Sequence, residues 1–372
     1  MKVDMRGSDA KQSAMFSYVT LSQRIPEDHP LRSIRLLVER ALESMDADFA
    51  KLYSVNGRPS IAPERLLRAQ LLQVLYSIRS ERQLIEQLDY NLLFRWFVGL
   101  EMDDAVWDVT VFTKNRERLI EGAASQRFLE AVLDQARERK LLSEEHFTVD
   151  GTLIQAWAAA RSFHPKDDPP APGKGSGSRG ELLLRDRVES KTDADARLYK
   201  KARPDKSVPC YLRHALMENR SGLVVAAEAS FSGNAAEREV ALTLLDRAVP
   251  AVAERAAGRA ITLGADTMYQ DKAFVEALRE RQIAPHVPEY PSGTNAWKNS
   301  LTEDERQDER MKISLNKRKL IERTFGWAKL DRPLRQVKLR GLARVDWFYR
   351  LVIAASNLVR LRRLIDLQTA AA

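Results

Sequence analysis

The order of predicted helices and strands constrains the fold of this 372-residue chain more than any other feature of its sequence. In residues 1–140, apolar side chains recur at helical spacing and predict several short helices. From His146 onward the predicted order is strand, hairpin, helix, strand, helix, strand, helix. Helices that alternate with strands bury their apolar sides on the faces of a sheet. We therefore predict an α+β fold with an α/β core, preceded by an all-helical region.

The strands of the second region have clear local signals. Val208 to Met217 and Leu223 to Phe231 flank the turn residues 219–222 and predict a β-hairpin. Residues 260–264 form a short apolar run that is typical of a buried strand. The order of these elements matches a ribonuclease-H-like mixed sheet flanked by helices, by analogy of element order alone.

Helices and loops complete this outline. Asn234 is expected to cap a helix that continues to about Ala257, and two long helices are expected over residues 309–329 and 343–366. Residues 162–209 are rich in Pro, Gly, Ser and charge and predict a flexible loop, and residues 289–308 predict a second polar loop. The predicted domains are residues 1–140, which are helical, and residues 141–366, which form the sheet domain.

The helical N-terminal region has two interpretations. Pro30 and Pro63 stand where a first helical turn tolerates proline, and Ser80 with Gln83 forms a capping-box pattern. Short helices joined by tight turns can place one helix in a major groove of DNA. The same pattern also suits a region that serves only packing or dimerisation, and the sequence leaves both open.

Composition excludes several classes of protein. A hydrophobic fraction of 44% with 30% charged residues fits a folded globular chain. The single cysteine, Cys210, excludes an intrachain disulfide and argues against a cysteine zinc site. Apolar runs are far shorter than the roughly 20 residues that span a bilayer, and the first residues have no apolar core of a signal peptide. We therefore expect a cytoplasmic protein that contacts no membrane.

Positive charge is concentrated near the end of the chain. The net charge is +8, yet residues 312–363 alone hold fifteen basic and three acidic side chains, a net charge of +12. Such a block attracts polyanions, nucleic acid above all. A solvated helical face explains the charge equally well when it is considered alone.

Two acids follow strand-like runs, where open α/β sheets tend to place function. Asp150 ends the run from His146, and Asp266 follows the run 260–264. A third candidate is Glu322, which shares one helical face with Arg318 and Lys329 because offsets of 4 and 11 residues return to nearly the same direction. Each of these acids also has an ordinary interpretation, as a helix cap for the two Asp residues and as an i,i+4 ion pair for Arg318 and Glu322.

Three converging carboxylates would repel one another unless a cation joined them. Hard divalent ions prefer oxygen ligands, so we expect Mg²⁺ or Mn²⁺, and two ions suit an in-line phosphoryl displacement. The five histidines form no metal-spaced cluster. Asp193, Asp195 and Asp271 lie in a loop or at a helix start and are rejected as ligands. Trp157, Trp327 and Trp347 are expected in the core rather than stacked on bases.

At these residues the chain resembles bacterial insertion-sequence transposases of the DDE class, of the group named after insertion sequence five and related to the insertion-sequence-four-like domain. Val149-Asp150-Gly151-Thr152 and Leu263-Gly264-Ala265-Asp266 match the first and second Asp blocks, and Arg318, Glu322 and Lys329 match the Arg-x3-Glu-x6-Lys signature. The family usually reads Asp-Lys-Gly-Tyr-Asp in the second block. This chain reads Asp266-Thr267-Met268-Tyr269-Gln270, which keeps the acid and the tyrosine only.

The resemblance implies a DNA transposase and endonuclease. It would bind the terminal inverted repeats of its element, cleave DNA by metal-assisted hydrolysis and join the 3′-OH ends to target DNA. Asp150, Asp266 and Glu322 would be the catalytic metal ligands, and the DNA-binding cations would be Arg318, Lys329, Lys319 and Arg323. The expected partners are double-stranded DNA and further copies of the chain, in a dimer or higher multimer at the bacterial nucleoid. The alternatives are a catalytically decayed transposase that only binds DNA, and a metal-dependent nuclease on the same fold.

Overall fold

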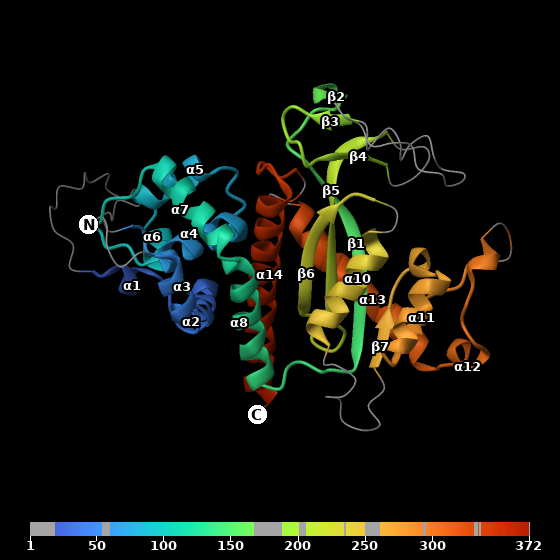
Figure 1. Ribbon diagram of the computed structural model, residues 1–372. Coiled ribbons are helices and arrows are strands. Elements are labelled where there is room, and N and C mark those ends of the chain that lie inside the picture. Colours follow the sequence, from blue (N-terminus) through green and yellow to red (C-terminus); the bar gives the residue numbers. More distant parts are fainter. Residues whose placement is uncertain are drawn as a thin grey trace, which may run out of the picture.

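A long C-terminal helix, α14 (Leu342–Ala371), lies between a group of helices and a sheet in the computed structural model of the protein (Figure 1). Helix α8 (Ala124–Glu138) runs along one side of α14, and strand β6 (Val224–Phe231) packs on the other. The structure describes residues 19–53, 60–166, 188–200, 206–233, 236–249, 261–291, 293, 295–330, 334 and 336–371.

The N-terminal region is helical, as its periodicity predicts. Pro30 opens α2 behind His29, whose imidazole accepts a hydrogen bond from the backbone N–H of Leu31. Ser80 caps α5 by accepting from the N–H of Gln83, so the predicted cap forms. The helices before α8 are α1 (Leu21–Arg24), α2 (Pro30–Glu43), α3 (Asp46–Leu52), α4 (Pro63–Leu75), α5 (Glu81–Tyr90), α6 (Leu92–Val98) and α7 (Val109–Glu121).

The second region is built on a mixed sheet whose path is β4-β5-β1-β7-β8, with β6 also paired to β5. Strand β5 pairs antiparallel with β4, β6 and β1. On its other side β1 pairs in parallel with β7, which in turn pairs in parallel with β8. This arrangement confirms the predicted ribonuclease-H-like mixed sheet and the predicted hairpin. The strands are β1 (His146–Gln155), β4 (Arg197–Tyr199), β5 (Val208–Glu218), β6 (Val224–Phe231), β7 (Ile261–Gly264) and β8 (Ile283–His286).

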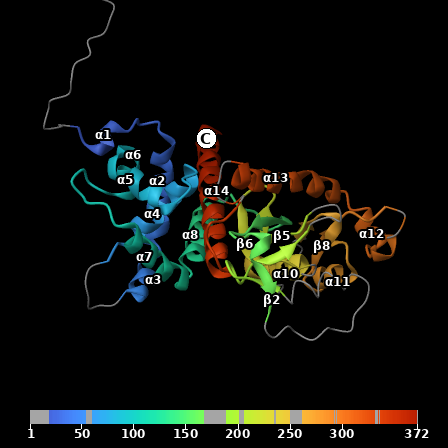
Figure 2. The ribbon, with the colours of Figure 1, turned by 90° about the horizontal axis from the view of Figure 1, so that it is seen from above.

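Helices cover both faces of the sheet. Figure 2 shows α13 (Arg310–Leu330) on one side, and α10 (Ala236–Ala248) and α11 (Lys272–Glu280) on the other. Alternation along β1 divides its side chains between the faces. Phe147 and Val149 join the core beneath α10 and α11, whereas Ile154 joins the core that contains α13 and α14. Asp150 and Ile154 are four residues apart on the strand, so their side chains point to the same face of the sheet, which α13 covers.

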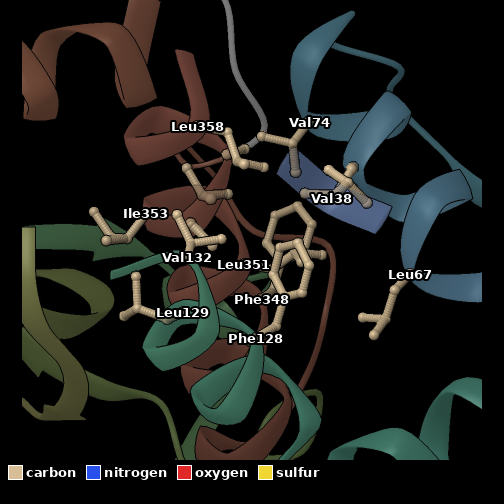
Figure 3. Packing of buried hydrophobic residues seen from close by; sticks show 14 of the residues in the cluster. Val38, Leu67, Val74, Phe128, Leu129, Val132, Phe348, Leu351, Ile353 and Leu358 are labelled. Carbon is tan, nitrogen blue, oxygen red and sulfur yellow. The ribbon is translucent and has the colours of Figure 1, made fainter. Parts of the chain in front are cut away.

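The larger core passes through α14 and joins both regions of the chain (Figure 3). Phe348 and Leu351 of α14 are buried among α8 residues such as Phe128 and Val132. On the sheet side, the amide of Asn357 accepts from the N–H of Val224 at 3.0 Å and donates to its carbonyl at 2.8 Å. The two predicted domains thus share one core, and the boundary at residue 140 remains a prediction about folding units.

The polar segments contain more structure than a loop prediction allows. Within 162–209, β2 (Phe163–Pro165) pairs with β3 (Val188–Ser190), and β4 extends the main sheet. Within 289–308 the structure has η4 (Ala296–Lys298) and α12 (Glu303–Arg306). These pieces span three or four residues, which is too short for a periodic signal. Several predicted features lie outside the described residues. They are the remainder of the predicted flexible loop (residues 167–187 and 201–205), the predicted cap Asn234 and the predicted helix end near Ala257.

Two acids of this polar segment anchor the start of α14. Asp193 is 3% exposed and accepts from the Tyr211 hydroxyl at 2.8 Å and from the Gly341 N–H at 3.0 Å. Asp195 accepts from the N–H of Leu342, the first residue of α14, at 2.8 Å. Both acids therefore have a structural role at the start of α14.

Replacing Asp193 should destabilise the fold more than replacing Asp195. Asp193→Ala leaves the buried Tyr211 hydroxyl without its acceptor, which should lower the free energy of unfolding by about 2–3 kcal/mol. Asp195→Ala removes one hydrogen bond near the surface and should cost about 1 kcal/mol. Chemical denaturation of both variants tests this order, and equal losses would contradict the anchoring role of Asp193.

Candidate functional site

Asp150 lies in the middle of β1, opposite Ala215 of β5. Its carboxylate accepts from the N–H of Gly151 at 2.9 Å and is half-buried. The position follows from the sequence, because the apolar run from Phe147 to Val149 forms a central strand of the sheet and leads directly into the acid.

Asp266 reaches the same edge from the neighbouring strand. Gly264, the last residue of β7, pairs with Thr148 of β1, so the chain leaves the sheet two residues before Asp266 and level with Asp150. There Asp266 caps η3 (Thr267–Tyr269) by accepting from the Met268 N–H at 2.8 Å. The altered residues Thr267 and Met268 therefore still form a capped turn.

The register of β1 and β7 places the two acids at the same level, because Asp150 and Asp266 each follow the pair Thr148 and Gly264 by two residues. Tyr269 lies three residues after Asp266. The pKa of its hydroxyl is raised well above the ordinary value, first by burial and then by the negative charges of Glu237, Asp150 and Asp266. Its ring packs against Phe274 at 5.5 Å between ring centres, and the residue is 1% exposed. The two acids therefore follow neighbouring parallel strands at the same level of the sheet.

Glu322 does not converge with these acids. Ile321, Phe325 and Ala328 bury one side of α13, and that packing leaves Glu322 with 59% of its side chain exposed. Its carboxylate lies 3.8 Å from the Arg318 guanidinium, which is the i,i+4 ion pair left open as an ordinary interpretation. Within the described ranges, no three His, Cys, Asp or Glu side chains are placed to hold one metal ion.

The predicted DNA-binding cations all lie along α13. Lys319 and Arg323 are exposed, and Arg318 is partly buried beside Glu322. The backbone of Lys329 belongs to α13, but its side chain lies outside the described part of the structure. The exposed positions suit contact with a large polyanion, and the structure does not decide between that and solvation.

A buried arginine on this face was not anticipated. Arg213 of β5 is 0% exposed, and its guanidinium lies 4.9 Å from the Phe325 ring centre and 5.9 Å from that of Tyr349. Burial lowers the pKa of Arg213, while the charge of Asp150 acts in the opposite direction. A charged residue within a buried strand, four residues after Pro209, was the signal that could have revealed it.

The tryptophans divide between core and surface. Trp347 is 3% exposed, and Trp327 is partly buried against the larger core, as predicted. Trp157 is 39% exposed, with the Lys338 ammonium 5.8 Å from its ring centre, so the prediction of a core position was wrong there. Trp157 lies just after β1 ends at Gln155, beyond the cover of α13 and α14.

Comparison with protein families matches both regions of the chain. Residues 19–118 match the model described as "Transposase domain (DUF772)", and residues 143–358 match the "Transposase DDE domain". The mixed sheet with helices on both faces is the ribonuclease-H-like arrangement predicted from the sequence. Since the second model covers more than half of the 372 residues, the chain belongs to the transposase DDE domain family.

Solved structures give only distant likenesses. A piggyBac transposase synaptic complex with hairpin DNA is 10% identical, with a TM-score of 0.38, and the match covers 90% of this chain and 75% of that one. The Mos1 strand transfer complex is 13% identical, with a TM-score of 0.21 and coverage of 81% and 91%. No curated protein matches the sequence significantly. In the described part of the chain, no helix has the length and apolar character of a membrane span.

The cap at Asp266 predicts which substitution is a clean probe of the site. Asp266→Asn keeps a side-chain oxygen that can accept from the Met268 N–H, so it should change the free energy of unfolding by only a few tenths of a kcal/mol. Asp266→Ala removes the cap and should cost about 1 kcal/mol. Thermal or denaturant unfolding of the pair measures the difference, and an equally damaging Asn variant would show that the cap is not the stabilising contact.

Proposed function

We propose that the protein is a DNA transposase that binds the terminal inverted repeats of an insertion sequence, cleaves DNA and joins the 3′-OH ends to target DNA. The observation that carries this proposal is the position of Asp150 and Asp266 at the same level of neighbouring parallel strands in a chain of the transposase DDE domain family. The match of motifs further supports membership of the group named after insertion sequence five. The proposal includes a dimer or higher multimer at the cytoplasmic nucleoid, because two element ends must be held together.

The residues at the sheet edge fit a divalent cation. Both acids offer carboxylate oxygens, the ligand type that Mg²⁺ and Mn²⁺ prefer. The buried hydroxyl of Tyr269, three residues after Asp266, has no hydrogen-bond partner within the described structure. A bound divalent cation supplies charge stabilisation and activates water or a 3′-hydroxyl for phosphoryl transfer.

We assign the protein residues separate roles in this reaction. Asp150 and Asp266 hold the cation, and Glu322 completes the ligand set in the DNA-bound state that we propose. The 3.8 Å separation from Arg318 is too long for a strong hydrogen bond, so little opposes a change of rotamer at Glu322. Arg318, Lys319, Arg323 and Lys329 contact the DNA backbone, and residues 1–140 contribute to DNA binding and multimerisation.

Cleavage and joining assays test the assignment of the acids. With inverted-repeat DNA and Mg²⁺ or Mn²⁺, Asp150→Asn, Asp266→Asn and Glu322→Gln should each lower both reactions by at least about 100-fold, because each loss of metal binding removes several kcal/mol of transition-state stabilisation. Asp271→Asn is the matched control. Asp271 lies nearby in the sequence and caps α11 by accepting a hydrogen bond from the backbone N–H of Phe274.

The same assay separates the alternatives. Robust joining by Asp266→Asn contradicts the ligand assignment. Cleavage without joining by the wild type identifies a nuclease, whereas repeat binding without either reaction identifies a decayed transposase. In that last case Thr267→Lys and Met268→Gly, which recover the usual family sequence, are the first reversions to examine.

Salt dependence tests the role of the cations on α13. Each phosphate contact contributes about 0.9 to the slope of log affinity against log salt concentration. Lys319→Gln should therefore lower the slope by about 1 and weaken binding to all sequences alike. Lys272→Gln is the control, because Lys272 is equally exposed but lies on α11. If the salt dependence of binding has the same slope for both variants, Lys319 does not contact the DNA backbone.

A further inference from the structure

The guanidinium of Arg213, on β5, is enclosed in the protein without hydrogen bonds. The residue is 0% exposed, and its Nε, Nη1 and Nη2 atoms are buried and have no hydrogen-bond partner in the part of the chain that the structure describes. An arginine stays protonated in a protein, and a buried charge is stable only when other groups compensate it. The surroundings of Arg213 must therefore balance its charge in another way.

Two aromatic rings provide part of this balance. The guanidinium carbon lies 4.9 Å from the ring centre of Phe325 on α13 and 5.9 Å from that of Tyr349 on α14. The Tyr349 hydroxyl donates to the backbone carbonyl of His214 at 3.1 Å, which fixes this ring against β5. A ring face attracts a cation, but it is only a weak hydrogen-bond acceptor. The charge of Arg213 therefore still favours a nearby anion.

Asp150 is the acid that the sheet places beside Arg213. Strands β1 and β5 are antiparallel, and their register pairs Asp150 with Ala215 and Thr152 with Arg213. Asp150 and Arg213 are therefore diagonal neighbours on the face of the sheet that α13 covers. The Cβ atoms of such neighbours lie about 7–8 Å apart, a gap that a long side chain can span. Burial lowers the pKa of Arg213, and the charge of Asp150 acts against this lowering.

The acid on α14 has a cation of its own. The carboxylate of Asp346 lies 2.9 Å from the guanidinium of Arg350 and accepts from the N–H of Ala229 at 2.7 Å. Among the described carboxylates, Asp150 is therefore the one that the register and the charge of Arg213 both indicate as its counter-ion.

A divalent cation on Asp150 would change this balance. The cation and the guanidinium carry charges of the same sign, and such charges repel more strongly where water is excluded than in bulk solvent. The carboxylate that attracts Arg213 in the empty site would then also have to bind the cation. Arg213 therefore stabilises the metal-free site relative to the loaded one.

We propose that Arg213 is a resident counter-charge for Asp150, which balances this carboxylate in the empty site and lowers the affinity of the DNA-free site for a divalent cation. The part of the inference that concerns the cation rests on the proposed function, because it requires Asp150 to be a ligand. The competing role is structural, since the stem and guanidinium of an arginine also fill space between rings.

A double-mutant cycle on metal-free protein, in the presence of a chelator, tests the pairing of Asp150 with Arg213. Asp150→Asn should lower the unfolding temperature of the wild type, because it leaves a buried cation without its anion. The same substitution in Arg213→Met should have little effect, because the cation is absent. Equal shifts of the unfolding temperature in both backgrounds overturn the pairing.

Calorimetric titration of the full-length protein with Mn²⁺, without DNA, tests the effect on the cation. Arg213→Met should bind Mn²⁺ roughly 10-fold more tightly than the wild type, because a like charge near the ion is removed. Arg213→Lys, which disturbs the same packing but keeps the charge, should bind like the wild type. Arg197→Met is the matched control, because the Arg197 guanidinium also lies on a ring, 5.0 Å from the centre of Phe231, but belongs to β4 opposite Cys210.

The outcomes separate this inference from the proposed function. If Asp150→Asn and Asp266→Asn abolish Mn²⁺ binding while Arg213→Met binds no more tightly than Arg197→Met, the counter-charge role is overturned and the proposed site stands. If the two Asn variants bind like the wild type, the proposed site fails, and the metal-free cycle still decides the pairing.

Folding of the neutral variants is itself informative. Arg213→Gln repeats both measurements with a polar, uncharged side chain. If the Met and Gln variants fold only when Asp150→Asn is also present, the pairing is supported, because both charges have then been removed together. If they fold in neither background, Arg213 is a structural residue and the inference is overturned.

Discussion

The burial of α14 on two sides is the interaction on which the rest of the structure depends. Phe348 and Leu351 face the N-terminal helices, while Asn357 ties the same helix to the first residue of β6 through two backbone hydrogen bonds. Because polar backbone groups at that strand end would otherwise be buried without partners, the position of α14 is fixed by chemistry as well as by apolar packing. Helix α14 thereby fixes the position of the β5–β6 hairpin. Because β5 pairs with β1, the position of Asp150 is fixed as well.

The site itself combines a rigid part with an adaptable one. Asp150 lies within a strand paired on both sides, and Asp266 is fixed by its cap, so neither can move far without breaking the sheet. Glu322 lies on a helix surface and is paired loosely. In the proposed site, Asp150 and Asp266 are preorganised, and Glu322 joins them only when a large charged substrate is bound. This suits a reaction in which the complex with the substrate must form before the chemical step.

Local sequence patterns predicted much of this architecture and a smaller part of the site. The hairpin, the strand before Asp266 and the two long C-terminal helices all have strong periodicity or turn residues, and each is present. The strands β2, β3 and β4 are three residues long and escape such patterns. Arg213 was missed because its surroundings come from residues that are distant in sequence, such as Phe325 of α13. Trp157 was misplaced for a related reason, since its exposure depends on where the covering helices end.

The shared core also has a consequence for how the chain folds during synthesis. The N-terminal helices are made first, but part of their apolar surface is covered by α14, which ends at Ala371. Until the thirty residues of α14 have left the ribosome, the surface around Phe128 that α14 covers stays exposed, and the sheet lacks this helix on one face. A chain truncated shortly before α14 would therefore expose apolar surface on both halves at once. The emergence of α14 during synthesis therefore couples the folding of the two halves.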